Sequence, residues 1–101
     1  MNIHWYSKAF IDLSPHELYK IMQLRNEVFV VEQNCVFQDA DNKDEGCLHF
    51  MGFMHDELIA YTRLSPQGYI YKEISIGRVV TSPQYRSKGL GKELMQHSID
   101  A

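Results

Sequence analysis

The 101-residue sequence predicts an α/β fold, formed as a single domain over residues 1–101. Two patterns support this prediction. Runs rich in Val, Ile, Tyr and Phe are typical of strands, whereas two other stretches place apolar residues at helical spacing. The expected order is strand, helix, acidic loop, three strands and a last helix, at residues 3–7, 14–31, 34–46, 47–54, 58–64, 69–81 and 90–101.

The first helix has a recognisable start. The Ser14 side chain can accept a hydrogen bond from the Glu17 amide, and the Glu17 side chain can reach back to the Ser14 amide. Pro15 takes the first helical position, where a backbone N–H is not needed. Apolar residues then follow at helical spacing to about Val31. Ahead of this helix, Ile3 and Trp5 alternate with polar residues and predict a short strand.

Two features of the predicted sheet depend on turns. The runs 47–54 and 58–64 are separated by only three residues, which predicts an antiparallel hairpin. A turn at Pro66–Gly68 leads into the long β-prone run 69–81, where Gly77 is a candidate β-bulge.

An acidic segment follows the first helix. Asp39, Asp41 and Asp44 lie in it, but an EF-hand starting at Asp39 would need Gly at its sixth position and Glu at its twelfth, where Asp44 and Phe50 stand. We interpret the segment as a solvated loop. The alternative is that its carboxylates line an acceptor pocket and attract a cationic amine.

Charge and composition exclude several classes of function. The formal net charge of −3 argues against broad electrostatic capture of nucleic acid or of an anionic membrane. The first residues do not resemble a signal peptide, and no apolar run approaches the roughly 20 residues that span a bilayer. With Cys35 and Cys47 interpreted as reduced, mostly buried thiols, we expect a cytoplasmic protein. The histidines lack metal-ligand spacing and GxSxG is absent, so we expect neither a metal site nor a serine hydrolase.

The stretch VVTSPQYRSKGLGKEL, residues 79–94, joins an apolar strand to a helix through a basic, glycine-containing loop. A helix start leaves about four backbone N–H groups without intrahelical partners, and its dipole adds partial positive charge. Glycines let an oxyanion approach those amides. A phosphate is the expected ligand. The alternative is a plain loop with solvated basic residues, which would show the same pattern of glycines and basic residues. The P-loop is excluded because Gly-Lys-Ser/Thr is absent, and GxGxxG fails because Leu94 replaces its third glycine.

The segment Arg86-Ser87-Lys88-Gly89-Leu90-Gly91 resembles the acyl-CoA-binding motif R/Q-x-x-G-x-G/A of GNAT acetyltransferases. In that family the loop amides hold the CoA pyrophosphate, and the preceding strand edge hydrogen-bonds the pantetheine arm. The resemblance therefore implies these cofactor-binding residues: Val79, Val80, Thr81, Arg86, Ser87, Lys88, Gly89, Leu90, Gly91 and Lys92.

A second stretch, residues 24–35 with Phe37, Asp39 and Asp41, resembles the N-terminal signature of the ElaA-like branch of this family. The fold implied is a GNAT fold, a mixed and mostly antiparallel sheet with flanking helices, of which this chain carries the N-terminal two-thirds. It is expected to stop after the helix that follows the acetyl-CoA-binding loop.

The activity implied is transfer of an acetyl group from acetyl-CoA to a primary amine of a small molecule or protein, by direct attack in a ternary complex and without a metal. Such a reaction needs a base to deprotonate the amine. Glu73, thirteen residues before Arg86 and on the predicted long strand, matches the position of the catalytic glutamate in some members. A strand-surface glutamate is the alternative. The alternative function is a non-catalytic acyl-CoA-binding or self-associating module, including a homodimer formed through an open sheet edge.

Overall fold

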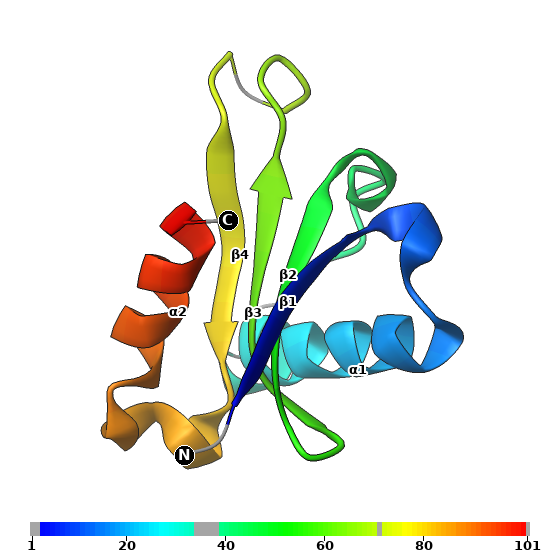
Figure 1. Ribbon diagram of the computed structural model, residues 1–101. Helices are drawn as coiled ribbons and strands as arrows, with labels where there is room; N and C mark the ends of the chain where they lie inside the picture. Colours follow the sequence, from blue (N-terminus) through cyan, green and yellow to red (C-terminus); the bar gives the residue numbers. More distant parts are fainter. Residues whose placement is uncertain (1–2, 34–38, 71, 101) are drawn as a thin grey trace.

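The computed structural model describes residues 3–33, 39–70 and 72–100 (Figure 1). Its strands form one antiparallel sheet in the order β1-β2-β3-β4. The predicted order of strands and helices is confirmed. The main elements are β1 (His4–Ala9), α1 (Pro15–Arg25), β2 (Leu48–Met54), β3 (Glu57–Ser65), β4 (Ser75–Thr81) and α2 (Leu90–Asp100).

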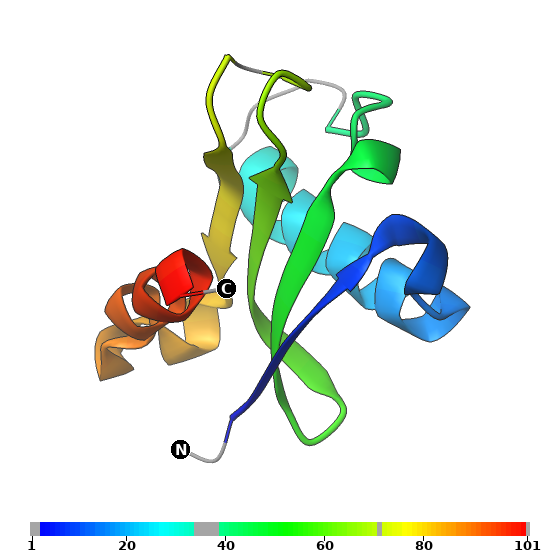
Figure 2. The same ribbon diagram turned by 45° about the horizontal axis from the view of Figure 1, so that its top comes forward.

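The two helices cover opposite faces of the sheet, which gives three layers (Figures 1 and 2). On the α1 face the core contains Ile21, Leu24 and Val28 packed against Met51 and Tyr61. On the other face Leu90 and Leu94 of α2 pack against residues of β2 and β3. Burial of apolar area on both faces is the main stabilising contribution to such a layered fold. Among the described residues, no helix is both long and apolar enough to cross a membrane.

The predicted start of α1 is confirmed. The Glu17 amide donates to Ser14 Oγ over 3.0 Å, and the Ser14 amide donates to Glu17 Oε1 over 2.8 Å. Glu17 also accepts hydrogen bonds from Tyr6 (2.7 Å) and Lys8 (3.0 Å) on β1. Burial opposes ionisation of Glu17, but these hydrogen bonds outweigh it and lower its pKa to about 2. One carboxylate therefore both caps α1 and ties it to the edge strand β1.

The helix continues beyond α1 in a different form. The prediction of one regular helix to Val31 is wrong in its last part, because residues Asn26–Glu32 form a π-helix. Its wider turn is marked by the hydrogen bond from the Gln33 amide to the Val28 carbonyl, five residues back, over 3.2 Å. β-Branched residues crowd the preceding turn of an α-helix, and three valines lie in this segment. π-Helical turns occur often at functional sites.

The last predicted strand is shorter than expected. Only Ser75–Thr81 forms a strand, so the prediction that the run begins at Tyr69 is wrong. The chain turns at Gly68, whose φ is 82°, and the Tyr69 ring packs over Gly46 so closely that a Cβ there would overlap it. Tyr69 is thereby held on the loop before β2, and the β3–β4 ladder stops at the pair Ser65 and Ser75.

A bulge interrupts β4, one residue later than predicted. Tyr61 pairs with Val80, whereas Arg63 pairs with Gly77, so Arg78 and Val79 together oppose Thr62. Arg78 adopts a left-handed conformation with φ 49°. Gly77 itself has no positive φ, and the prediction that it forms the bulge is therefore wrong by one position.

Candidate acyl-CoA site

The predicted cofactor segment begins on the exposed edge of β4. Val79 is 41% exposed, whereas Val80 is 3% exposed and belongs to the core on the α1 face. Thr81 is half-buried. The Ser82 amide donates to the Ile59 carbonyl over 2.7 Å and closes the ladder. The sheet therefore holds this segment in place through Val80 and leaves Val79 exposed at the edge strand.

The chain then passes through a short 3₁₀-helix, Pro83–Lys88, before α2 begins at Leu90. Gly89, between the two, has φ 73°, a conformation that glycine adopts without steric cost. A Cβ built on Gly89 or on Gly91 would meet no atom within 4 Å, so both positions face open space. Gly89 is exposed and Gly91 is half-buried, so the start of α2 is open to solvent at these two positions, and the first turn of a helix carries amides that can bind an anion.

The remaining predicted residues of the loop differ in position. Leu90 is fully buried against the sheet and fixes the start of α2. Lys92 is exposed. The side chains of Ser87 and Lys88 lie outside the described part of the structure.

Arg86 has a partner that the sequence did not predict. Its guanidinium forms a bidentate salt bridge with the carboxylate of Glu32, at the end of the π-helix, and both N···O distances are 2.8 Å. It also donates to the Thr81 carbonyl over 3.2 Å. The pair joins residues 54 positions apart, and both side chains are about 40% exposed. The Arg86 guanidinium, which was expected to bind a phosphate, is therefore already paired with the Glu32 carboxylate.

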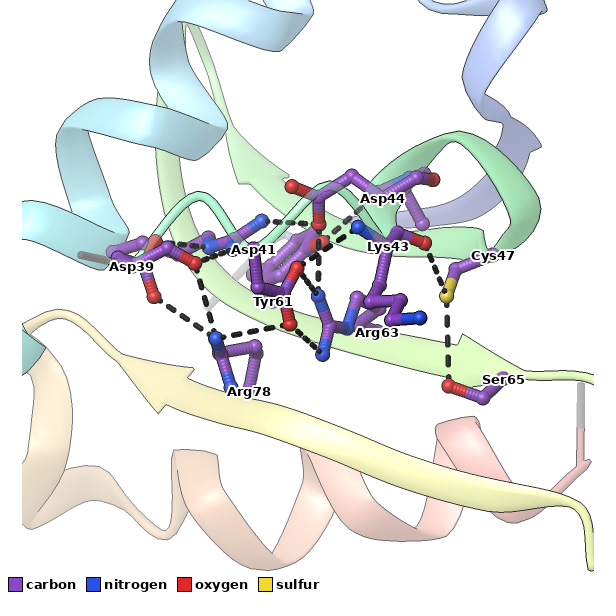
Figure 3. Close-up of polar contacts among 11 residues, drawn as sticks. Asp39, Asp41, Lys43, Asp44, Cys47, Tyr61, Arg63, Ser65 and Arg78 are labelled. Carbon is purple, nitrogen blue, oxygen red and sulfur yellow. Dashed lines mark hydrogen bonds and ion pairs between the residues drawn. The ribbon is translucent and has the colours of Figure 1, made fainter. Parts of the chain in front are cut away.

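A network of arginines and aspartates lies beside β4 (Figure 3). The fully buried Arg25 donates to Asp39 over 2.7 Å and to Asp44 over 2.8 Å. Arg63 of β3 donates to Asp41 over 2.9 Å and to Asp44 over 3.1 Å. The interpretation of this segment as a solvated loop is wrong for Asp39 and Asp44, which are buried and neutralise arginines, whereas other described residues of the segment, such as Asn42 and Glu45, are exposed.

Asp39 and Asp44 are 5% and 7% exposed, and each is hydrogen-bonded to guanidinium groups. Their charge is compensated, which also argues against the hypothesis that they attract a cationic amine. Burial opposes ionisation of Asp41, but its hydrogen bonds with Arg63 outweigh that effect and lower its pKa to about 2. Residue spacing did not predict this network, because its arginines, Arg25, Arg63 and Arg78, belong to three elements that lie far apart in the chain, α1, β3 and β4.

His49 and Tyr61 extend the same buried region. His49 Nδ1 lies 2.6 Å from Tyr61 Oη, and His49 Nε2 lies 2.9 Å from the Asp44 carbonyl. Burial lowers the pKa of His49, so the imidazole is neutral at pH 7 and one nitrogen donates while the other accepts. The Cys47 thiol is buried as predicted and lies 3.2 Å from the Lys43 carbonyl. The second predicted thiol, Cys35, lies outside the described residues.

Glu73 does not lie on a strand. It is exposed and belongs to the connection between β3 and β4, two residues before β4 begins. This connection and the 3₁₀-helix Pro83–Lys88 leave β4 at opposite ends (Figure 1). The alternative of a strand-surface glutamate is wrong for the same reason, and the nearby Arg78 is paired with Asp39 and Asp41.

A strand that leads through a left-handed glycine into the start of a helix is an arrangement that suits anion binding in α/β proteins. A family model described as "Acetyltransferase (GNAT) family" matches residues 4–101. The chain belongs to this family of acyl-CoA N-acyltransferases, and the resemblance inferred from the glycine loop is confirmed.

The relatives identify the branch. The chain is 41% identical over 96 residues to UPF0039 protein sll0451 of Synechocystis sp., which covers 94% of this chain and 62% of that protein. It is 38% identical over 100 residues to Protein ElaA of Escherichia coli, covering 97% and 65%. The expected ElaA-like branch is thus confirmed, and the chain spans a little under two thirds of the length of these relatives.

Two solved structures are similar to this chain over nearly its whole length. An acyl-CoA N-acyltransferase from Pseudomonas aeruginosa is 40% identical, with a TM-score of 0.93 over 99% of this chain and 70% of that chain. The crystal structure of Escherichia coli ElaA is 38% identical, with a TM-score of 0.92 over 98% and 68%. The predicted GNAT fold is therefore confirmed.

Proposed function

We propose that the protein transfers an acetyl group from acetyl-CoA to a primary amine of a small molecule or protein, by direct attack in a ternary complex. One observation carries this proposal most strongly. The edge strand β4, with Val79 41% exposed, leads through Thr81 and a short 3₁₀-helix to the helix start at Gly89 and Gly91, where open space faces both glycines. An extended arm and a diphosphate, the two parts of CoA, match these two surfaces.

Each part of the segment has a proposed role. The amides at the start of α2 would hold the diphosphate, and Arg86, Lys88 and Lys92 would add charge-assisted hydrogen bonds. The backbone from Val79 to Thr81 would pair with the pantetheine arm as an added strand does. Ser87 would contribute through its backbone, and the fully buried Leu90 would hold the start of α2 in place.

Glu73 is the proposed base. A pantetheine arm that runs along β4 away from the helix start would carry the thioester toward the end of the strand near Glu73. Its exposed position supports access to an acceptor amine. The carboxylate would take the proton, directly or through water, because an ammonium group has no lone pair for attack.

The acyl-donor assignment is tested by calorimetry. We expect acetyl-CoA and CoA to bind more tightly than inorganic pyrophosphate, because only they engage the β4 edge. Thiol release with a panel of primary amines then measures turnover. Equal affinities for CoA and pyrophosphate would instead identify a plain anion site. If none of the three ligands binds, the proposal is wrong.

The base is tested separately. Glu73→Gln should lower kcat at neutral pH by about 10²-fold or more, the usual contribution of a general base. The loss should be smaller at high pH, where more of the amine is already neutral. The affinity for acetyl-CoA should be unchanged. A pH–rate profile identical to that of the wild type would show that Glu73 is a surface residue.

A second candidate is a non-catalytic acyl-CoA-binding or self-associating module. The observation in its favour is that β4 forms an edge of the sheet in the described part of the chain. An unpaired strand edge is a template for another chain, and a homodimer would use it. Acetyl-CoA binding without amine-dependent thiol release would favour this function. We also propose a cytoplasmic location, the compartment in which a reduced, buried thiol such as Cys47 is expected.

A further inference from the structure

Arg78 combines two unusual properties at the start of the proposed pantetheine edge. It has a left-handed φ of 49° although it carries a side chain, and it forms the β4 bulge with Val79 opposite Thr62. A residue other than glycine pays a steric cost for this conformation, and such residues cluster at functional sites when their surroundings hold them in place. Gly77, which could adopt it without that cost, is adjacent but does not.

The Arg78 side chain is held at three points. Nε lies 2.9 Å from Asp39 Oδ1, and Nη2 lies 3.0 Å from the Asp39 carbonyl and 3.4 Å from Asp41 Oδ2 (Figure 3). Asp39 is itself fixed, because Arg25 donates to its Oδ2 over 2.7 Å and to its carbonyl over 3.2 Å. Arg25 is fully buried and belongs to α1. The guanidinium of Arg78 is therefore anchored to the helix layer rather than to β4.

This anchor bears on the direction of the neighbouring backbone groups. The φ of Arg78 and the bulge set how the peptide between Arg78 and Val79 is turned. Without the anchor, Arg78 would be free to relax to an extended conformation, and a change of one residue in the register reverses the face of every following residue. Val79, Val80 and Thr81 are those following residues.

We propose that Arg78 is a positioning residue for the acyl donor. Held by Asp39 and Asp41, it keeps the β4 bulge in the one conformation that aims the Val79–Thr81 backbone at the pantetheine arm. This inference rests on the proposed function. It predicts that the ion pairs of Arg78 control affinity for the arm of CoA but not affinity for the diphosphate.

The test compares two ligands on each variant. Acetyl-CoA should contact both the edge and the loop, whereas ADP carries the diphosphate without a pantetheine arm. Arg78→Ala should weaken acetyl-CoA binding by about tenfold or more and leave ADP affinity within about twofold. Arg78→Gly, which tolerates positive φ, should lose less than Arg78→Ala. Arg78→Lys, which keeps the charge but not the planar fork, should also weaken acetyl-CoA selectively.

Arg63→Lys is the matched control. Arg63 contacts the same Asp41 carboxylate over 2.9 Å but belongs to β3, so this variant should leave the ratio of acetyl-CoA to ADP affinity unchanged. Amide NMR shifts of Val79, Val80 and Thr81 provide a readout that needs no ligand, and they should move in Arg78→Ala more than in Arg63→Lys. If Arg78→Ala does not fold, Arg78→Gly and Arg78→Lys carry the same comparison.

The outcomes separate the two proposals. If the wild-type protein binds neither ligand, both the proposed function and the positioning role of Arg78 are wrong. If the wild type binds acetyl-CoA but the Arg78 variants bind it equally well, only the positioning role is wrong. An equal loss of acetyl-CoA and ADP affinity in the Arg78 variants would also overturn it, because that result indicates general destabilisation.

Discussion

The pair formed by Arg86 and Glu32 illustrates what a single residue of the motif faces in this fold. Arg86 was predicted from the loop sequence to meet a phosphate, yet both prongs of its guanidinium contact Glu32 at 2.8 Å. A planar guanidinium binds a carboxylate and a phosphate with the same two-pronged geometry. Glu32 therefore competes with the ligand for the same donors.

Glu32→Gln should strengthen CoA binding. Because both side chains are about 40% exposed, the pair is worth at most about 1 kcal/mol, which corresponds to a gain of up to roughly fivefold in affinity. Calorimetry at low and high salt checks this, and the gain should shrink as salt screens the charges.

Glu27→Gln is the control for this substitution, since it removes the same charge from the same π-helix at a residue that is exposed. It should change CoA affinity by less than Glu32→Gln. Weaker CoA binding in Glu32→Gln would mean the opposite role, in which Glu32 holds Arg86 in position for the phosphate.

At the scale of elements, local chemistry predicted the starts of segments better than their ends. The capping box at Ser14 and Glu17 involves neighbours three residues apart, and it is present as expected. The change from α1 to a π-helix after Arg25 and the late start of β4 at Ser75 were not predicted. Both depend on contacts with remote residues: Val28 is buried in the core beneath the sheet, and Tyr69 packs over Gly46.

The bulge in β4 shows the same limit. A glycine in a strand is a reasonable marker of a bulge, and Gly77 did indicate the right part of the strand. The left-handed residue is nevertheless Arg78, because its guanidinium reaches Asp39, 39 positions earlier in the chain. A side chain anchored outside the strand overrode the backbone preference of the residue beside it.

At the scale of the whole molecule, two carboxylates join layers and edges of the fold. Glu17 ties α1 to β1, and Asp41 ties the segment after the π-helix to β3 and β4. The pKa of each is about 2 in the folded protein, below the value of about 4 for an unfolded chain. The stability they contribute is present above about pH 4 and is lost as the pH falls through the folded pKa.

Acid should therefore destabilise the protein. Between pH 5 and pH 2 we expect a loss of about 4 to 5 kcal/mol in the free energy of unfolding, because each of the two pKa values is lowered by about two units and one unit corresponds to about 1.4 kcal/mol. The loss is seen as a lower urea midpoint. The double variant Glu17→Gln with Asp41→Asn should be less stable at pH 7 and show a shallower dependence on pH in this range. A wild-type urea midpoint that stays constant from pH 5 to pH 2 would contradict this assignment.

The sequence by itself determined the α/β class, the order of the strands and helices, the helix cap and the glycine loop of the GNAT family. Each of these depends on residues within one turn of helix, one strand or one loop, so short-range spacing is sufficient to specify it. Only the tertiary structure decided that the aspartates of the acidic segment pair with Arg25, Arg63 and Arg78. It also decided that Arg86 is paired with Glu32 and that Glu73 lies outside the strand. The ion pairs join residues far apart in the chain. The position of a charged residue in the sequence does not indicate which partner it will meet, because that partner is brought to it only when the chain packs.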